Sequence, residues 1–137
     1  MIKGLRVSSI WSEDLNNLLP FYRDTLGLTA GMEAPGFVIL GDPNAPAAAL
    51  GTHSEVHGRA VDPARHIVGF DTDDMKGDCA RLKRAGVEFV EEPNQQGDVW
   101  VATFKDPEGE PGPAAAVRGL GEASESRLGP RPTFENL

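Results

Sequence analysis

The side chains best suited to metal binding or proton transfer in this sequence are three histidines, His53, His57 and His66. His53 and His57 are four residues apart, a spacing that brings two ligands together only on a helix. Residues 51–58 contain two glycines and a serine, so we expect a loop there. The sequence therefore favours solvated loop histidines, and a metal site that uses one or more of the three stays an open alternative.

Two pairs of carboxylates, Asp73-Asp74 and Glu91-Glu92, could also carry chemistry. The first pair is typical of a helix start and the second of a strand end. Both places are solvated, whereas a catalytic carboxylate pair needs two different environments. The single cysteine, Cys79, excludes an intrachain disulfide and a thiolate zinc cluster, and we interpret it as a small apolar residue on a helix.

The two tryptophans offer a different chemistry, because aromatic walls bind flat or cationic molecules by stacking and apolar burial. Trp11 ends a predicted strand over residues 5–11, on the face that also carries Val7 and Ser9. The sequence is equally compatible with a Trp11 side chain in a cleft and with one in the core. Ser9 is a candidate for a polar contact on the same face.

Trp100 belongs to a second predicted strand, over residues 99–104, and shares one face of it with Ala102 and Phe104. Core packing is favoured for Phe104. Trp100 is a candidate aromatic wall, and Thr103 is a candidate polar contact from the same strand.

The composition of the chain limits the classes of partner that it can bind. The formal net charge is −8 with a pI near 4.8, which argues against nucleic acid or an anionic membrane as the main partner. A neutral or cationic ligand is compatible with it. No apolar run approaches the roughly 20 residues of a membrane span, and the first residues lack the apolar core of a signal peptide. We therefore expect a cytoplasmic protein.

The elements that must position these side chains fall into two similar halves. The first half reads as a strand over residues 5–11, one helix over 12–26, and strands over 37–40 and 47–51. Pro20 lies inside the predicted helix and is expected to weaken or kink it.

The second half repeats this order. It reads as a strand over residues 66–71, a helix over 75–85, a strand over 87–90, and the strand over 99–104. Pro93-Asn94 and residues 96–98 are predicted to reverse the chain between the last two strands.

We interpret residues 1–58 and 59–118 as two βαβββ modules that arose by internal duplication, joined by a polar loop. Residues 119–137 read as a poorly ordered tail. Two prolines within residues 110–113 argue against a central strand there. Residues 114–117 are compatible with a short strand or with one helical turn.

Three segments carry a family resemblance: FYRDTLGL at residues 21–28, LKRAGV at 82–87 and FKDPEG at 104–109. They resemble the vicinal oxygen chelate superfamily, the group of glyoxalases, bleomycin resistance proteins and extradiol dioxygenases, over residues 1–109. The resemblance implies an α+β fold in which two βαβββ modules form a curved mixed sheet around a cleft. The last strand is expected to be degenerate here. It also implies a homodimer, since many members are dimers.

Metal-using members place His, Glu or Gln at four positions in the cleft. By the resemblance these positions fall here on Val7, the Ala/Leu/Gly stretch at residues 47–51, Ile67 and Pro113. None of these side chains is a metal ligand. His66 adjoins Ile67, but a shift of one residue turns a strand side chain to the opposite face. We therefore predict no metal, no other cofactor and no metal chemistry.

The leading hypothesis is a metal-free protein that binds and sequesters a small hydrophobic or cationic molecule, such as an antibiotic, without transforming it. One alternative is a metal-dependent lyase, isomerase or dioxygenase whose ligands are misplaced in this reading or come from another chain. Another is a degenerate member that serves as a dimerisation module. The predicted ligand-binding residues are Val7, Ser9, Trp11, Ile67, Trp100 and Thr103.

Overall fold

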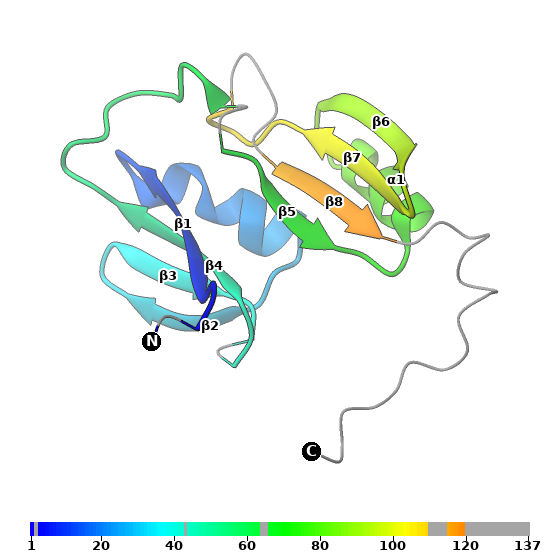
Figure 1. The fold of residues 1–137 in the computed structure, drawn as a ribbon. Helices are drawn as coiled ribbons and strands as arrows, with labels where there is room; N and C mark the ends of the chain where they lie inside the picture. The colour runs from blue at the N-terminus through cyan, green and yellow to red at the C-terminus, as the bar shows by residue number, and fades with distance from the viewer. Residues whose placement is uncertain (2, 43, 64–65, 110–114, 120–137) are drawn as a thin grey trace.

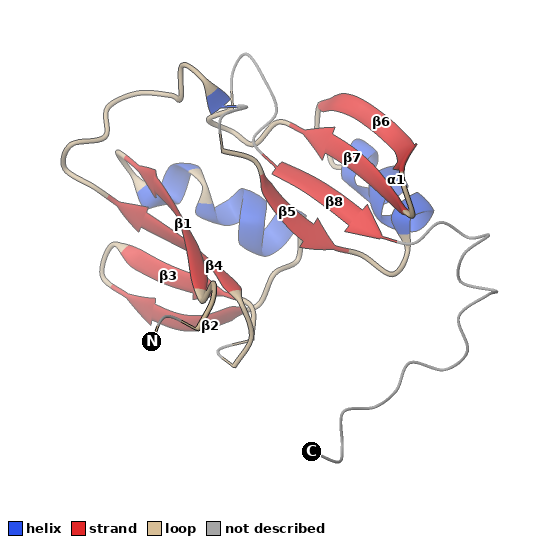
Figure 2. Cartoon of the chain, in the orientation of Figure 1, coloured by secondary structure: helices blue, strands red, loops and turns tan. Residues whose placement is uncertain are grey.

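The computed structural model describes residues 1, 3–42, 44–63, 66–109 and 115–119, which Figure 1 draws in colour. This part of the chain forms two four-stranded mixed sheets with helical segments beside them (Figure 2). The α+β class and the repeated order of strand, helix and three strands are as predicted from the sequence.

The two sheets have the same topology. The first has the strand order β1-β4-β3-β2 and the second has the order β5-β8-β7-β6, so in each the first and last strands of the module are parallel neighbours. The strands are β1 (Val7–Ser12), β2 (Ala30–Ala34), β3 (Phe37–Leu40), β4 (Ala47–Thr52), β5 (Val68–Asp71), β6 (Phe89–Gln96), β7 (Val99–Phe104) and β8 (Ala115–Gly119). This shared topology is the structural counterpart of the predicted duplication.

The single helix predicted for the first half is wrong, because two short helices replace it. These are η1 (Leu15–Asn17) and η2 (Pro20–Thr25). Pro20 has no N–H to donate to a preceding turn and therefore occupies the first position of a new helix. Within η2 the turns are wide, since the Leu26 N–H donates to the Phe21 carbonyl at 2.8 Å, five residues back.

The helix of the second half, α1 (Met75–Arg84), follows its prediction closely. The Asp74 carboxylate caps it by accepting from the Gly77 N–H at 2.9 Å. Its buried residues are Met75, Cys79 and Leu82. Burial raises the pKa of the Cys79 thiol, which agrees with its interpretation as an apolar core residue.

Strand β6 corrects the turn predicted at Pro93-Asn94. The strand continues through Pro93, with register shifts between Phe89 and Asn94, and the chain reverses at Gly97, within the second predicted turn at residues 96–98. Because β6 is the edge strand of its sheet and is irregular at this point, the missing N–H of a proline is tolerated there. Strand β2, which has no β-branched residue, was not among the strands predicted.

Strand β8 corrects the expectation of a degenerate last strand. It is a central strand, parallel to β5 and antiparallel to β7. Ala115, Ala116 and Val117 are all buried in it, and their small side chains fit between two neighbouring strands. Residues 110–113 and the predicted tail after Gly119 lie outside the described residues.

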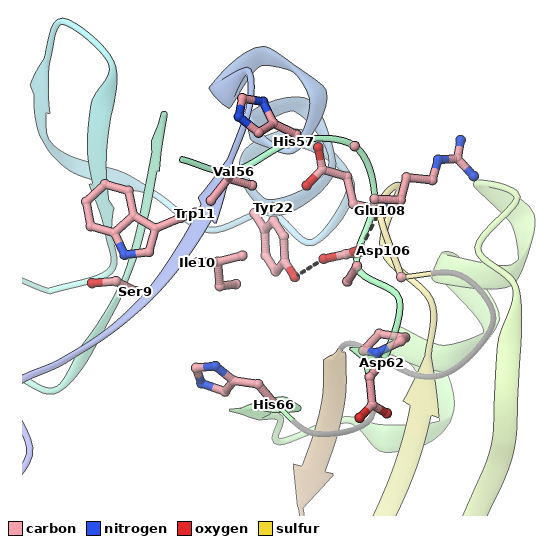
Figure 3. Close-up of a pocket in the computed structure, with 15 residues that line it drawn as sticks. Ser9, Ile10, Trp11, Tyr22, Val56, His57, Asp62, His66, Asp106 and Glu108 are labelled. Carbon is pink, nitrogen blue, oxygen red and sulfur yellow. Dashed lines mark hydrogen bonds between the residues drawn. The ribbon is translucent and has the colours of Figure 1, made fainter. Parts of the chain in front are cut away.

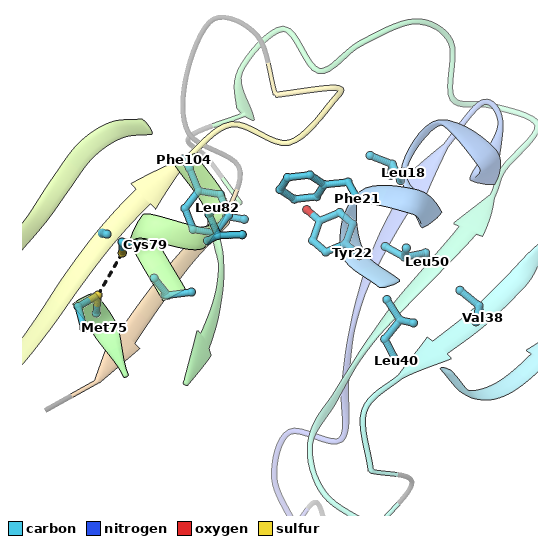
Figure 4. Packing of buried hydrophobic residues seen from close by; sticks show 13 residues of the cluster. Leu18, Phe21, Tyr22, Val38, Leu40, Leu50, Met75, Cys79, Leu82 and Phe104 are labelled. Atoms are coloured by element: carbon cyan, nitrogen blue, oxygen red, sulfur yellow. Dashed lines mark hydrogen bonds between the residues drawn. The ribbon is translucent and has the colours of Figure 1, made fainter. Parts of the chain in front are cut away.

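One hydrophobic core joins the two halves (Figure 4). Phe21 and Tyr22 of η2 pack against the second module: the Phe21 ring is 6.2 Å from the Phe104 ring, and the Tyr22 ring is 6.1 Å from the Phe70 ring. On the other side of η2 lie Leu40 and Leu50 of the first sheet, and Figure 4 shows η2 between these two groups. The core therefore depends on both modules at once.

Candidate functional site

A hollow of about 300 Å³ lies between the two modules, beside β1 and beneath the loop that follows β4 (Figure 3). It collects side chains from both halves of the sequence. The lining residues named below come from β1, η2, the loop over residues 56–63, His66 and the turn after β7. A hollow of this kind, apolar with a few convergent polar groups, is the usual form of a small-molecule site.

Trp11 borders this hollow from β1, and its indole lies on the open face of the first sheet. In the sheet it is opposite Gly51, and Gly51 is opposite Phe37, so the three residues share one face. A Cβ atom at position 51 would overlap the Trp11 ring, which means that the indole lies directly on the glycine backbone. The Trp11 ring is 6.0 Å from Phe37 and 5.6 Å from His53. Trp11 nevertheless stays 42% exposed and is available to a ligand.

A hydrogen bond between the two modules lies at the bottom of the hollow. The Tyr22 hydroxyl donates to the Asp106 carboxylate at 2.7 Å, and Asp106 is only 8% exposed. The same carboxylate accepts the Glu108 N–H at 2.9 Å. Burial, with the neighbouring Asp106 carboxylate, raises the pKa of Tyr22 above its ordinary value. The phenol is therefore a stable donor at neutral pH.

Glu108 attaches the turn after β7 to the first module. The hydroxyl of Ser12, which is fully buried, donates to its Oε1 at 2.6 Å. The Asn17 amide donates to the same oxygen at 3.4 Å. Short hydrogen bonds to a carboxylate are among the stronger ones in proteins, so the orientation of Glu108 is well determined.

The loop after β4 covers one side of the hollow. The Gly58 N–H donates to the Glu13 carboxylate at 3.0 Å, and the His53 ring accepts the Glu55 N–H at 3.2 Å through Nδ1. His57 lines the hollow from this loop. At the far end of the hollow, the His66 Nε2 lies 3.3 Å from the Ser8 hydroxyl of β1.

Two of the predicted ligand-binding residues border this hollow. Ser9 and Trp11 line it. Val7 lies on the same face of β1, and Ile67 precedes β5; each is 40% exposed, and neither is among the lining residues.

Trp100 and Thr103 are placed elsewhere by β7. They are three residues apart on a strand and therefore lie on opposite faces. Trp100 packs against the hydrophobic core. The Thr103 hydroxyl is buried and has no hydrogen-bond partner among the described residues. Neither residue lines the hollow.

Several lining residues were not predicted as a site. His57 was considered only as a metal ligand or a loop residue, and Tyr22, Asp106 and Glu108 were considered only as parts of local motifs. The signal was present in the segments FYRDTLGL and DPEG, which contain the last three. The sequence did not show that these two segments touch in the fold, because Tyr22 and Asp106 are 84 residues apart in the chain.

The side chains at the described metal positions of the family do not fit a divalent ion. Val7, the residues of β4 up to Gly51, and Ile67 provide no side-chain oxygen, nitrogen or sulfur. Pro113 lies outside the described part of the chain. Within residues 1, 3–42, 44–63, 66–109 and 115–119, no three His, Cys, Asp or Glu side chains come together as a metal-binding group.

The repeated topology and the intermodule hollow agree with the comparison to known families. A model described as the Glyoxalase/Bleomycin resistance protein/Dioxygenase superfamily matches residues 5–111, so the chain belongs to this superfamily. No protein with a curated functional description matches the sequence.

Several solved structures share the fold. TnmS3, described as an antibiotic binding protein from Streptomyces sp. CB03234, is 22% identical with a TM-score of 0.68 over 88% of this chain and 98% of that one. A glyoxalase/dioxygenase from Nostoc punctiforme is 14% identical with a TM-score of 0.69 over 88% and 92%. An integron cassette protein from the mobile metagenome of the Halifax Harbour sewage outfall is 21% identical with a TM-score of 0.66 over 87% and 100%.

These comparisons confirm the predicted family and the predicted fold of paired βαβββ modules. At such low identity each structure shows the fold alone. Among the helices of the described residues, none is long and apolar enough to cross a membrane.

Proposed function

We propose that this protein binds and sequesters a small, flat, apolar molecule and makes or breaks no bond in it. The observation that carries the proposal is the Trp11 ring, which lies on Gly51 beside Phe37 and stays 42% exposed on the open face of the first sheet. The hydrocarbon side chains at the described metal positions support binding over metal chemistry.

Ser9 and Trp11 are the proposed direct contacts. Stacking on the indole supplies most of the binding free energy, and the Ser9 hydroxyl supplies a polar contact. Val7 and Ile67 are proposed to flank the bound molecule as apolar surface. Trp100 and Thr103 are left out because Trp100 packs against the core and the Thr103 hydroxyl is buried.

The dimensions of the Trp11 ring favour a small ligand. A flat molecule of two or three fused rings matches one indole face better than a glycopeptide does. The description of TnmS3 as antibiotic binding supports an antibiotic as one class of ligand to test.

We also propose a homodimer, in which a second copy covers the open face of the first sheet. Val7, Trp11 and Met32 are exposed large apolar residues on this part of the molecule, and contiguous apolar surface is typical of interfaces. Light scattering after size exclusion should give twice the chain mass; a single-chain mass at all concentrations would contradict this proposal.

The binding proposal is tested by titrating flat aromatic compounds and antibiotics into the protein, followed by calorimetry and tryptophan fluorescence. Saturable binding with one ligand per chain is expected. Trp11→Ala should weaken it by about 5- to 150-fold, as expected when a stacking contact of about 1–3 kcal/mol is removed. Trp100→Phe is the matched control and should bind normally.

Two results would favour the enzyme alternative instead. One is a chemically altered ligand in mass spectra after incubation. The other is a stoichiometric transition metal in protein purified without chelator, together with loss of binding after chelation. The proposal expects the ligand to be recovered unchanged and the affinity to be the same before and after chelation.

A further inference from the structure

We propose that His53 makes the Trp11 surface selective for flat ring systems that carry a hydrogen-bond acceptor on their edge. The inference rests on the proposed binding function and adds to it the polar group that the ligand presents and the residue that recognises this group. Its experiment is designed so that stacking and selectivity can fail separately.

His53 and Trp11 lie on the same face of the first sheet. Trp11 is opposite Gly51 of β4. The His53 N–H donates to the Ser12 carbonyl at 2.9 Å, which continues the pairing of β1 and β4 one residue beyond the strand. Because side chains alternate along a strand, residues 51 and 53 face the same side. Figure 3 shows the Trp11 ring on the side of β1 opposite to Tyr22, so a molecule stacked on the indole does not need to reach the bottom of the hollow.

The two rings meet at a steep angle. Their centroids are 5.6 Å apart and their planes are 72° apart, so the imidazole of His53 stands beside the indole of Trp11 and is not stacked on it. The inner side of the indole lies on the Gly51 backbone, and 42% of Trp11 stays exposed. A flat molecule stacked on the outer side of the indole would therefore have the imidazole next to one of its edges.

The hydrogen bonding of His53 determines which ring nitrogen is a donor. Nδ1 accepts the Glu55 N–H at 3.2 Å, so the proton of the neutral ring is on Nε2. Nε2 has no hydrogen-bond partner within the described residues. An unused N–H beside an exposed aromatic ring is a donor for a carbonyl oxygen or a ring nitrogen of a ligand.

The loop that begins at His53 keeps this donor in place. The backbone of His53 is bonded on both sides, since its N–H donates to Ser12 and its carbonyl accepts the Val56 N–H at 3.1 Å. Further along the loop, the Gly58 N–H donates to the Glu13 carboxylate at 3.0 Å. The imidazole is therefore positioned before a ligand arrives, which lowers the entropy cost of using it.

The experiment compares three probes that share one fused two-ring shape. Naphthalene has no acceptor. Quinoline has a ring nitrogen that accepts a hydrogen bond, and it is uncharged at about pH 8. In N-methylquinolinium a methyl group blocks this nitrogen and the ring carries a positive charge. Dissociation constants are measured by NMR titration of ¹⁵N-labelled protein, in which the indole N–H signal of Trp11 reports stacking.

His53→Phe keeps a ring beside Trp11 but removes the donor. It should weaken quinoline binding by about 2- to 10-fold, as expected when one hydrogen bond between uncharged groups is lost, and it should change naphthalene binding by less than about twofold. His53→Gln, whose amide can donate, should restore part of the preference for quinoline. Glu55→Ala is the matched control, because it keeps the backbone N–H that Nδ1 accepts. It should leave the affinities for both uncharged probes unchanged.

A measurement on the native protein tests the donor without any variant. Long-range ¹H–¹⁵N spectra distinguish a protonated from an unprotonated ring nitrogen of histidine. In the free protein, His53 should carry its proton on Nε2. The Nε2 signal should then shift on addition of quinoline and shift much less with naphthalene, whereas a purely structural histidine would respond equally to both.

Four outcomes would overturn the inference. A His53 proton on Nδ1 in the free protein would remove the donor. The same ratio of quinoline to naphthalene affinity in the native protein and in His53→Phe would show that His53 does not select the acceptor, and would leave stacking on Trp11 standing. Tightest binding of N-methylquinolinium would assign selectivity to charge. Absence of binding by all three probes would overturn the proposed binding function as well.

Discussion

At the residue scale, the contact between Tyr22 and Asp106 links the site to the stability of the molecule. Both groups are buried, and the hydrogen bond joins η2 of the first module to the turn after β7. An acceptor buried without its donor loses its solvation and gains nothing in return. Loss of this one hydrogen bond is therefore expected to lower the free energy of unfolding measurably.

Tyr22→Phe is expected to lower the free energy of unfolding by about 1–3 kcal/mol, because it leaves the Asp106 carboxylate with one buried partner fewer. Chemical denaturation followed by circular dichroism measures this change. Arg23→Lys, which alters an exposed ion pair beside it, is the control and should cost much less. A Phe variant as stable as the native protein would show that solvent replaces the hydroxyl.

The raised pKa of Tyr22 gives a pH dependence with a definite sign. A group whose pKa is raised on folding contributes stability that is complete below its unfolded pKa of about 10 and is lost as pH rises above it. Because Tyr22 is the single tyrosine, tyrosinate absorbance reports it alone. This absorbance should appear only together with unfolding at alkaline pH. Its appearance in the folded protein near pH 10 would contradict the burial of the hydroxyl.

At the element scale, the pairing of β1, β4 and β3 creates the aromatic wall. Parallel pairing brings Trp11 opposite Gly51, and antiparallel pairing brings Phe37 opposite the same glycine. Only a residue without a side chain allows the indole to lie on the sheet at this point. The register of three strands therefore determines where the ring can be.

Gly51→Ala should displace the Trp11 ring, since the added methyl group would occupy its place. We expect a loss of about 1–3 kcal/mol in stability, as for other overpacked sites, with a changed tryptophan emission and weaker ligand binding. Gly69→Ala in β5 is the matched control, because its added methyl group meets nothing. Equal effects of the two substitutions on the emission would contradict the packing of Trp11 on Gly51.

At the scale of the whole molecule, the two modules share one core and one hollow. The rings of η2 pack against those of the second module, and Ser12 and Tyr22 donate to the turn after β7. Neither half keeps a complete core when the other is removed. The hollow exists only while both are folded.

Thermal unfolding should therefore occur in one cooperative step, with equal calorimetric and van't Hoff enthalpies. Scanning calorimetry of the full chain tests this expectation. A proposed ligand should shift the whole transition upward, because it binds only the folded state. Two separate transitions, with only one of them shifted by ligand, would contradict a shared core.

Much of the fold was accessible from the sequence because its signals are local. Asp74, the apolar spacing of Met75, Cys79 and Leu82, and the run of β7 predicted their elements correctly. The failures have local causes too. Pro20 divided the first helix, and Pro93 was accepted in an edge strand because no neighbour needed its N–H on that side.

The sequence by itself determined the family, the repeated module and the two motifs that later met, because each depends on residues close together in the chain. The tertiary structure alone decided which of their side chains share a hollow. It assigned Trp100 to the core face of β7 and Trp11 to the open face of the first sheet, and it brought Tyr22, Asp106 and Glu108 together across the two modules. The physical reason is that strand register and intermodule packing are set by contacts between distant segments, which local spacing does not record.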